Sequence, residues 1–142
     1  MQRFRTATPM GDWRSFKFTH EEVGVTYTEG LIYKIEDTIG ILLLDIQYNT
    51  DGSKKAKTIV EDDEGVLVYH IEKVIVDKVT TTGTACKPGD KIYWSGVQGA
   101  AVTPVYVQGY YWVGICVKAA AESDDEVMVD FKGDKASVTQ PL

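Results

Sequence analysis

The sequence has 142 residues, the length of one domain that buries a hydrophobic core without needing disulfides or a metal ion. Its formal net charge is −6 and its pI is near 4.9, which argues against a nucleic-acid surface because such a surface needs clustered Lys and Arg. No segment reaches the length of a membrane-spanning helix, and residues 1–7 lack the apolar run of a secretory signal. We therefore expect a cytosolic product that contacts neither nucleic acid nor membrane.

Positive charge and aromatic side chains are concentrated near the N-terminus. Residues 1–19 have a net charge of +3, and the remaining residues have a net charge of −9. The basic region also contains Phe4, Trp13 and Phe16, and aromatic residues and Arg are enriched in the cores of protein interfaces. We expect residues 1–20 to form an extended N-terminal arm that binds a partner. The alternative is an ordinary edge strand whose aromatic side chains complete the core.

Short runs of alternating or apolar residues, separated by turn residues, predict strands along residues 23–79. The run at 39–44 is apolar on both faces and is expected to be the central buried strand. Residues 49–55 are polar and predict a hairpin tip or a loop. In chain order, the predicted strands cover residues 23–27, 31–35, 39–44, 66–71 and 72–79.

The segment 89–131 predicts a three-stranded β-meander. Pro88-Gly89-Asp90 is a turn that precedes the short aromatic strand 91–94. Residues 110–117 and 127–131 each alternate between the two faces of a sheet. The meander is therefore expected to place one apolar face of each strand in the core.

Together these patterns predict an all-β domain over residues 21–132, folded as a small antiparallel β-barrel or sandwich. At most one short helical turn is expected, at residues 119–122. The C-terminal tail, residues 133–142, is polar, so we expect it to be either disordered or laid on a neighbouring subunit.

The sequence contains no recognisable catalytic or metal-binding motif. Cys86 and Cys116 lie far apart, without a C-x-x-C spacing or a nearby His, which disfavours a metal site. Because the chain is expected to be cytosolic, buried reduced thiols are favoured over a disulfide. The carboxylates at 61–64 lack the interleaved spacing of a calcium loop. No G-x-S-x-G elbow occurs, and His20 and His70 have no nucleophile beside them in the sequence. We expect no catalytic residue, no metal ion and no cofactor.

Five motifs occur in a fixed order along residues 23–132. They are Gly40-Ile41-Leu42-Leu43, Glu64-Gly65-Val66, Gly89-Asp90-Lys91-Ile92-Tyr93-Trp94, Val113-Gly114-Ile115-Cys116-Val117-Lys118-Ala119-Ala120 and Val127-Met128-Val129-Asp130-Phe131. This ordered set resembles the pattern of the decoration or cement proteins of tailed phages, small proteins that coat the capsid. Residues 13–20 and 71–84 match none of the motifs.

The resemblance implies a structural virion protein that is made in the host cytoplasm and binds the outside of the phage head. It implies stabilisation of contacts between subunits of the major capsid protein, and because similar proteins commonly sit at local three-fold positions, we expect a homotrimer. Members of the family are sometimes labelled as RecA-type recombinases. Such an ATPase needs G-x-x-x-x-G-K-[ST], whereas Gly109 and Gly114, which have this spacing, are followed by Ile115 and Cys116. We therefore do not expect an enzyme.

Two sets of residues are expected to form the contacts. The capsid-binding residues are expected in the arm, and they are Arg3, Phe4, Arg5, Trp13, Arg14 and Phe16. Aromatic residues of the meander are expected at the oligomer interface, and they are Tyr93, Trp94, Tyr110 and Trp112. The alternative function is a ligand- or glycan-binding β-module in which these aromatics and Tyr111 form a stacking platform, although successive strand residues point to opposite faces.

Overall fold

The computed structural model describes residues 5–6, 13–19, 25–27, 30–43, 47–48, 50, 54–55, 57–59, 64–133 and 137–138. Within these ranges the chain is all β, without an α-helix, which confirms the predicted fold class. The strands are β1 (Arg5–Thr6), β2 (Trp13–Thr19), β3 (Val25–Tyr27), β4 (Ile32–Ile35), β5 (Thr38–Leu43), β6 (Gln47–Tyr48), β7 (Lys54–Lys55), β8 (Lys57–Ile59), β9 (Glu64–Asp77), β10 (Lys91–Trp94), β11 (Val102–Thr103), β12 (Tyr111–Cys116), β13 (Glu126–Lys132) and β14 (Ser137–Val138).

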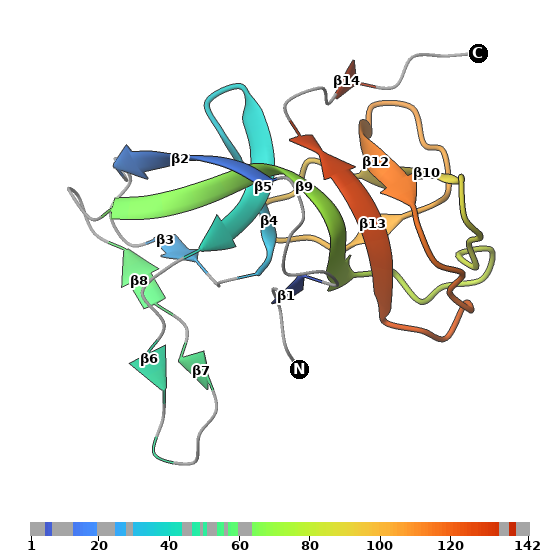
Figure 1. Cartoon of the computed structure of the whole chain (residues 1–142), viewed down its shortest axis with the longest axis horizontal. Coiled ribbons are helices and arrows are strands. Elements are labelled where there is room, and N and C mark those ends of the chain that lie inside the picture. The colour runs from blue at the N-terminus through green and yellow to red at the C-terminus, as the bar shows by residue number, and fades with distance from the viewer. Residues whose placement is uncertain are drawn as a thin grey trace.

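The main sheet follows the order β11-β10-β12-β13-β9-β5-β4, and each neighbouring pair on this path is antiparallel. The sheet curls strongly (Figure 1). A parallel bridge joins Lys78, just after β9, to Val102 of β11, and Val79 N donates to Val102 O at 2.9 Å. This bridge brings together the two ends of the five-strand path from β9 to β11, as in a small barrel.

The long strand β9 organises the sheet, because both of its edges are paired. Ile71 is opposite Trp13 of β2 on one edge and Phe131 of β13 on the other. The sequence predicted two strands here, 66–71 and 72–79. The structure instead has one strand of 14 residues that contains Lys73 at φ 52°, and the register against β13 shifts nearby. A local irregularity of this kind bends a strand without ending it.

The predicted N-terminal arm is extended, and its described parts pair with β9. β2 lies antiparallel to the first half of β9, and β1 lies opposite Val74 and Ile75. Residues 13–19 therefore form a strand along the edge of β9. The tail contributes the short strand β14, which pairs with β12.

Two local predictions concern residues 119–122 and β5. At most one helical turn was expected, at 119–122, and no helix forms there, because Ala120 forms an antiparallel bridge with Cys86 and Asp124 N donates to Ala121 O across a turn. The predicted position of β5 needs correction. The strand predicted as central, β5, lies between β4 and β9, one place from the end of the sheet path. Its apolar character on both faces is explained by burial, since Ile39, Ile41 and Leu42 are buried.

The short strands outside the main sheet form two small pairs. β3 pairs with β8, and β6 pairs with β7. The β6–β7 pair flanks the polar segment predicted as a hairpin tip and projects away from the main sheet in Figure 1.

One hydrophobic core runs through the curled sheet. Its largest fully buried side chain is Trp94, whose indole Nε1 donates to Ala100 O at 3.1 Å. Phe131 of β13 and Ile92 of β10 are also fully buried in this core. Burying each large apolar side chain contributes about 2 kcal/mol, so this core supplies a major part of the driving force for folding.

Candidate functional site

The six residues predicted to bind the capsid are only partly described. Arg3 and Phe4 lie outside the described residues, while the others belong to strands that pair with β9. Arg14 is exposed on β2, next to exposed Ser15. The register of β2 against β9 shifts between these two residues, so both can face outward instead of alternating. The four residues in strands are Arg5 of β1 and Trp13, Arg14 and Phe16 of β2.

The four aromatics predicted at the oligomer interface divide into two groups. Trp94 is fully buried within the subunit, and Tyr93 is 8% exposed, so these two residues are core. Tyr110 and Trp112 are half-buried and retain exposed area. A stacking platform that uses all the aromatics at once is therefore not present, because Trp94 offers no ring face to a ligand.

The ring of Tyr93 packs against the ring of Tyr106 within the same subunit. The two rings meet edge-on, with centroids 5.9 Å apart. Burial raises the pKa of the Tyr93 hydroxyl, and the neighbouring Tyr106 raises it further. Tyr93 is therefore neutral and structural at physiological pH.

A second candidate surface was not anticipated from the sequence. Every residue from 92 to 117 is uncharged, although 25% of the whole chain is charged. This stretch includes two loops, 95–101 and 104–110, which we call the uncharged loop face. The large hydrophobic side chains with the greatest exposure among the described residues all lie there, at Val97 (65%), Val105 (39%) and Val107 (38%). The absence of charge along this run was the sequence signal that could have identified the surface.

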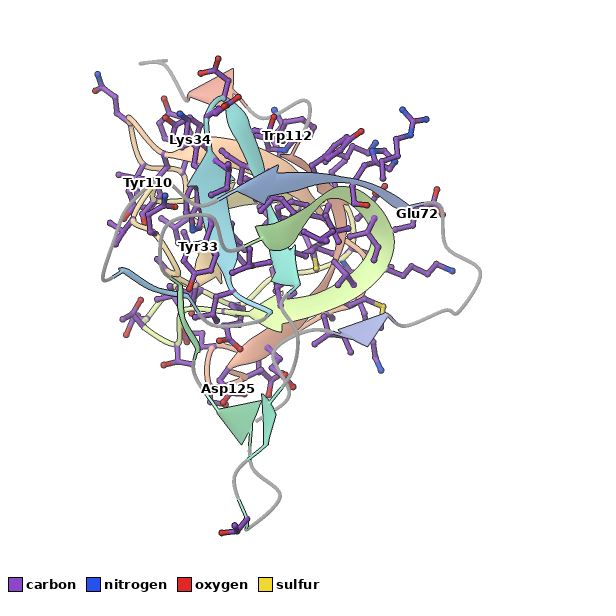
Figure 2. The ribbon with its side chains drawn as sticks, turned by 90° about the vertical axis from the view of Figure 1, so that its left-hand side faces the viewer. Tyr33, Lys34, Glu72, Tyr110, Trp112 and Asp125 are labelled. Carbon is purple, nitrogen blue, oxygen red and sulfur yellow. The ribbon has the colours of Figure 1, made fainter. Side chains whose placement is uncertain are left out.

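A pocket of about 300 Å³ opens beside the uncharged loop face. Apolar side chains including Val79, Ala100 and Val105 share its lining with hydroxyl side chains including Thr82 and Tyr110. Tyr110 lies on the same side of the molecule as Tyr33 and Lys34, and Glu72 lies on the opposite side (Figure 2). The pocket provides a mainly apolar recess within an uncharged surface.

The loop 95–101 is fixed to the edge of β4. Gly99 N donates to Ile32 O at 2.7 Å. The Gln98 side chain accepts from Lys34 N at 2.7 Å and donates to Lys34 O at 2.9 Å. The side-chain amide of Gln98 thus forms the backbone hydrogen bonds that a neighbouring strand would form, and it fastens the loop to β4.

Two features are absent from the described part of the chain. No group of three or more His, Cys, Asp or Glu side chains within it could hold a metal ion. No helix in the described part of the chain is long and apolar enough to cross a membrane.

Comparison with known proteins identifies the family. A family model described as phage cement protein matches residues 15–131. Comparisons with curated proteins and with solved structures find no significant match. The family match covers most of the chain, including β9, the uncharged loop face and β2 from Ser15 onward, and it leaves Trp13 and Arg14 outside. The chain therefore belongs to the phage cement protein family.

Proposed function

We propose that this protein is a capsid decoration protein, which binds the outside of the phage head and stabilises contacts between subunits of the major capsid protein. The observation that carries the proposal is the family match over residues 15–131. The all-β architecture and the surfaces suited to protein contacts support it. This role requires no catalysis, cofactor, nucleic acid or membrane.

The capsid contact is assigned to the N-terminal region. Residues 1–19 carry a net charge of +3 on a chain whose remainder carries −9. Opposite charge on the capsid would steer this region into place, and aromatic side chains such as Trp13 would supply the buried anchor. Because β2 lies along β9, this part of the arm would be presented by the sheet as a fixed surface. Arg3, Phe4 and Arg5 would extend the same contact.

The uncharged loop face is assigned to contacts between copies of this chain in a homotrimer. Each copy carries a net charge of −6, so self-association through a charged face would bring like charges together. A face without charge, with Val97, Val105 and Val107 exposed, avoids this repulsion and buries apolar surface. Tyr110 and Trp112 would border this interface. A trimer would then present three basic arms to the repeating capsid lattice, which raises the effective concentration of each arm.

The experiment that tests capsid binding uses phage heads that lack the protein. Purified protein is mixed with these heads, and the bound fraction is measured by co-sedimentation at several salt concentrations. Replacing Arg3, Arg5 and Arg14 with Glu should weaken binding more than tenfold, and the wild-type affinity should fall as salt rises. The matched control replaces the exposed Lys87, Lys91 and Lys118 with Glu, which makes the same change in net charge on the body.

The control variant should bind nearly as well as the wild type. Equal losses in the two variants would show a general charge effect and would contradict the assignment to the arm. Absence of wild-type binding to heads at low salt would contradict the proposed function itself.

A further inference from the structure

Two buried cysteines face each other where the meander meets the segment before β10. The Cys86 and Cys116 sulfur atoms lie 3.6 Å apart. Both residues are free thiols, and their exposures are 6% and 2%. No third metal-ligating side chain joins them among the described residues. The pair is a candidate for covalent bonding between the two sulfurs.

We propose that Cys86 and Cys116 are a latent disulfide, which closes under oxidising conditions and cross-links the segment before β10 to the end of β12. This goes beyond capsid binding, because it is a covalent modification of the subunit itself. The structure has the two buried free thiols expected from the sequence, and the proposal adds an oxidised form of the same pair.

The backbone already holds the two residues in place. Cys86 and Ala120 exchange a pair of backbone hydrogen bonds, each 2.9 Å long. Gly89 N donates to Cys116 O at 2.9 Å, and Cys116 N donates to Asp90 O at 2.8 Å. A disulfide requires sulfur atoms about 2.05 Å apart, so each sulfur has to move by less than about 1 Å. Side-chain rotation supplies this movement without changing the strand pairing.

The oxidation can proceed by thiol–disulfide exchange with a low-molecular-weight disulfide. The thiolate of Cys86, the more exposed residue, attacks one sulfur of that disulfide, forms a mixed disulfide and releases one small thiol. Cys116 then gives up its proton and attacks the Cys86 sulfur, which forms the internal bond and releases the second small thiol. The two protein thiols lose two electrons and two protons in total, and the small disulfide gains them.

The environment of Cys116 makes the reaction slow in the folded protein. Burial raises the pKa of the Cys116 thiol to about 12, and its hydrogen bond to Cys86 adds to the increase. The bonding partners close by are the Cys86 sulfur and Lys118 O, which lies 3.1 Å from the Cys116 sulfur. Because the thiolate is scarce, the pair resists oxidation during brief exposure and closes on long exposure.

The cross-link would tie together the base of the uncharged loop face. The covalent loop runs from residue 86 to residue 116 and includes both 95–101 and 104–110. Constraining a loop of this length in the unfolded chain should raise the unfolding temperature by roughly 10 °C. If the proposed location on the head exterior is right, the protein leaves the reducing cytoplasm at lysis, and the bond would then form.

The test uses the full-length protein, purified with reductant and then incubated with oxidised glutathione after the reductant is removed. Intact mass spectrometry should show a product that has lost two hydrogen atoms and carries no glutathione. On a denaturing gel without reductant it should migrate as a single subunit, and its unfolding temperature should rise. Cys86→Ala and Cys116→Ala are the controls, since each has only one thiol and should keep that thiol or form a glutathione adduct.

Incubation near the unfolding midpoint removes the protection due to burial. The proposal would be overturned if the wild type then remained reduced, kept stable glutathione adducts or formed cross-linked subunits instead of the internal bond. It would equally be overturned if the internal bond formed and lowered the unfolding temperature. The assay contains no phage heads, so its outcome is independent of the test of capsid binding.

Discussion

At the scale of single residues, the structure explains why one position of the family-like motif in β12 is glycine. A Cβ atom added to Gly114 would lie 2.2 Å from Asp130 O in the neighbouring strand β13. Any side chain would therefore push β12 and β13 apart, and the meander depends on this close approach. The neighbouring motif residues Val113 and Cys116 are buried, so the motif reflects packing of the barrel.

Also at the residue scale, Cys116 predicts a loss of stability at alkaline pH under reducing conditions. The pKa of its thiol rises from 9.0 to about 12 on folding, because of burial first and the bond to Cys86 second. The folded state therefore keeps a proton that the unfolded state loses, so this contribution to stability is complete below about pH 9 and declines above it. The decline is at most about 1.4 kcal/mol per pH unit.

The measurement is urea unfolding with reductant at about pH 8 and about pH 10. The wild type should lose more free energy of unfolding between these conditions than Cys116→Ala does. Tyr93, whose pKa is also raised from its ordinary value of 10.0, adds a loss of the same sign at higher pH in both proteins. An equal loss in the two proteins would show that Cys116 does not carry the effect.

At the scale of elements, Gln98 predicts how the edge of β4 is protected. Gln98→Ala removes both hydrogen bonds to the Lys34 backbone. Because Gln98 is solvent-exposed, water replaces part of these bonds, so the free energy of unfolding should fall by only about 1 kcal/mol. Hydrogen exchange at the Lys34 amide should become at least several-fold faster. Gln108→Ala, in the adjacent exposed loop, should leave the Lys34 amide unchanged. Unchanged Lys34 exchange in Gln98→Ala would contradict the role of this amide.

Local patterns in the sequence predict some elements of the fold and not others. The strands of the meander were predictable because alternation within each strand records its burial, as in β12 and β13. The continuity of β9 was not predictable. Lys73 interrupts the local alternation of the sequence, and the strand continues through this position because it pairs with strands distant in sequence. The bridge from Lys78 to Val102 and the contact from Gln98 to Lys34 join residues far apart in sequence, so no local pattern records them.

The division into an arm at 1–20, a domain at 21–132 and a tail at 133–142 remains a prediction. Because β2 pairs with β9, deleting the arm would also expose an edge of β9. Substitution of single residues therefore tests the arm more cleanly than deletion. The basic arm was identified from charge and aromatic content. The uncharged loop face was not predicted, because its signal is the absence of charged residues from 92 to 117 and not a motif.

At the scale of the whole molecule, the uncharged loop face predicts the effect of new charges on assembly. Val97→Asp and Val105→Asp place carboxylates at the proposed contact between copies, where they would face each other across the interface. Sedimentation should show a trimer for the wild type and at least a tenfold weaker association for the double variant. The matched control, Thr50→Asp with Ser123→Asp, adds the same charge at exposed sites that belong neither to these loops nor to the pocket lining. A wild-type monomer at all concentrations, in solution and on heads, would contradict the trimer.

The central claim is that the protein stabilises the assembled phage head, and the thermal opening of heads tests it most directly. Heads lacking the protein are titrated with purified protein and heated while release of the packaged DNA is followed. The opening temperature should rise with added protein and reach a plateau when the binding sites on the head are filled. Heads that bind the protein to saturation and still open at the temperature of undecorated heads would contradict the claim.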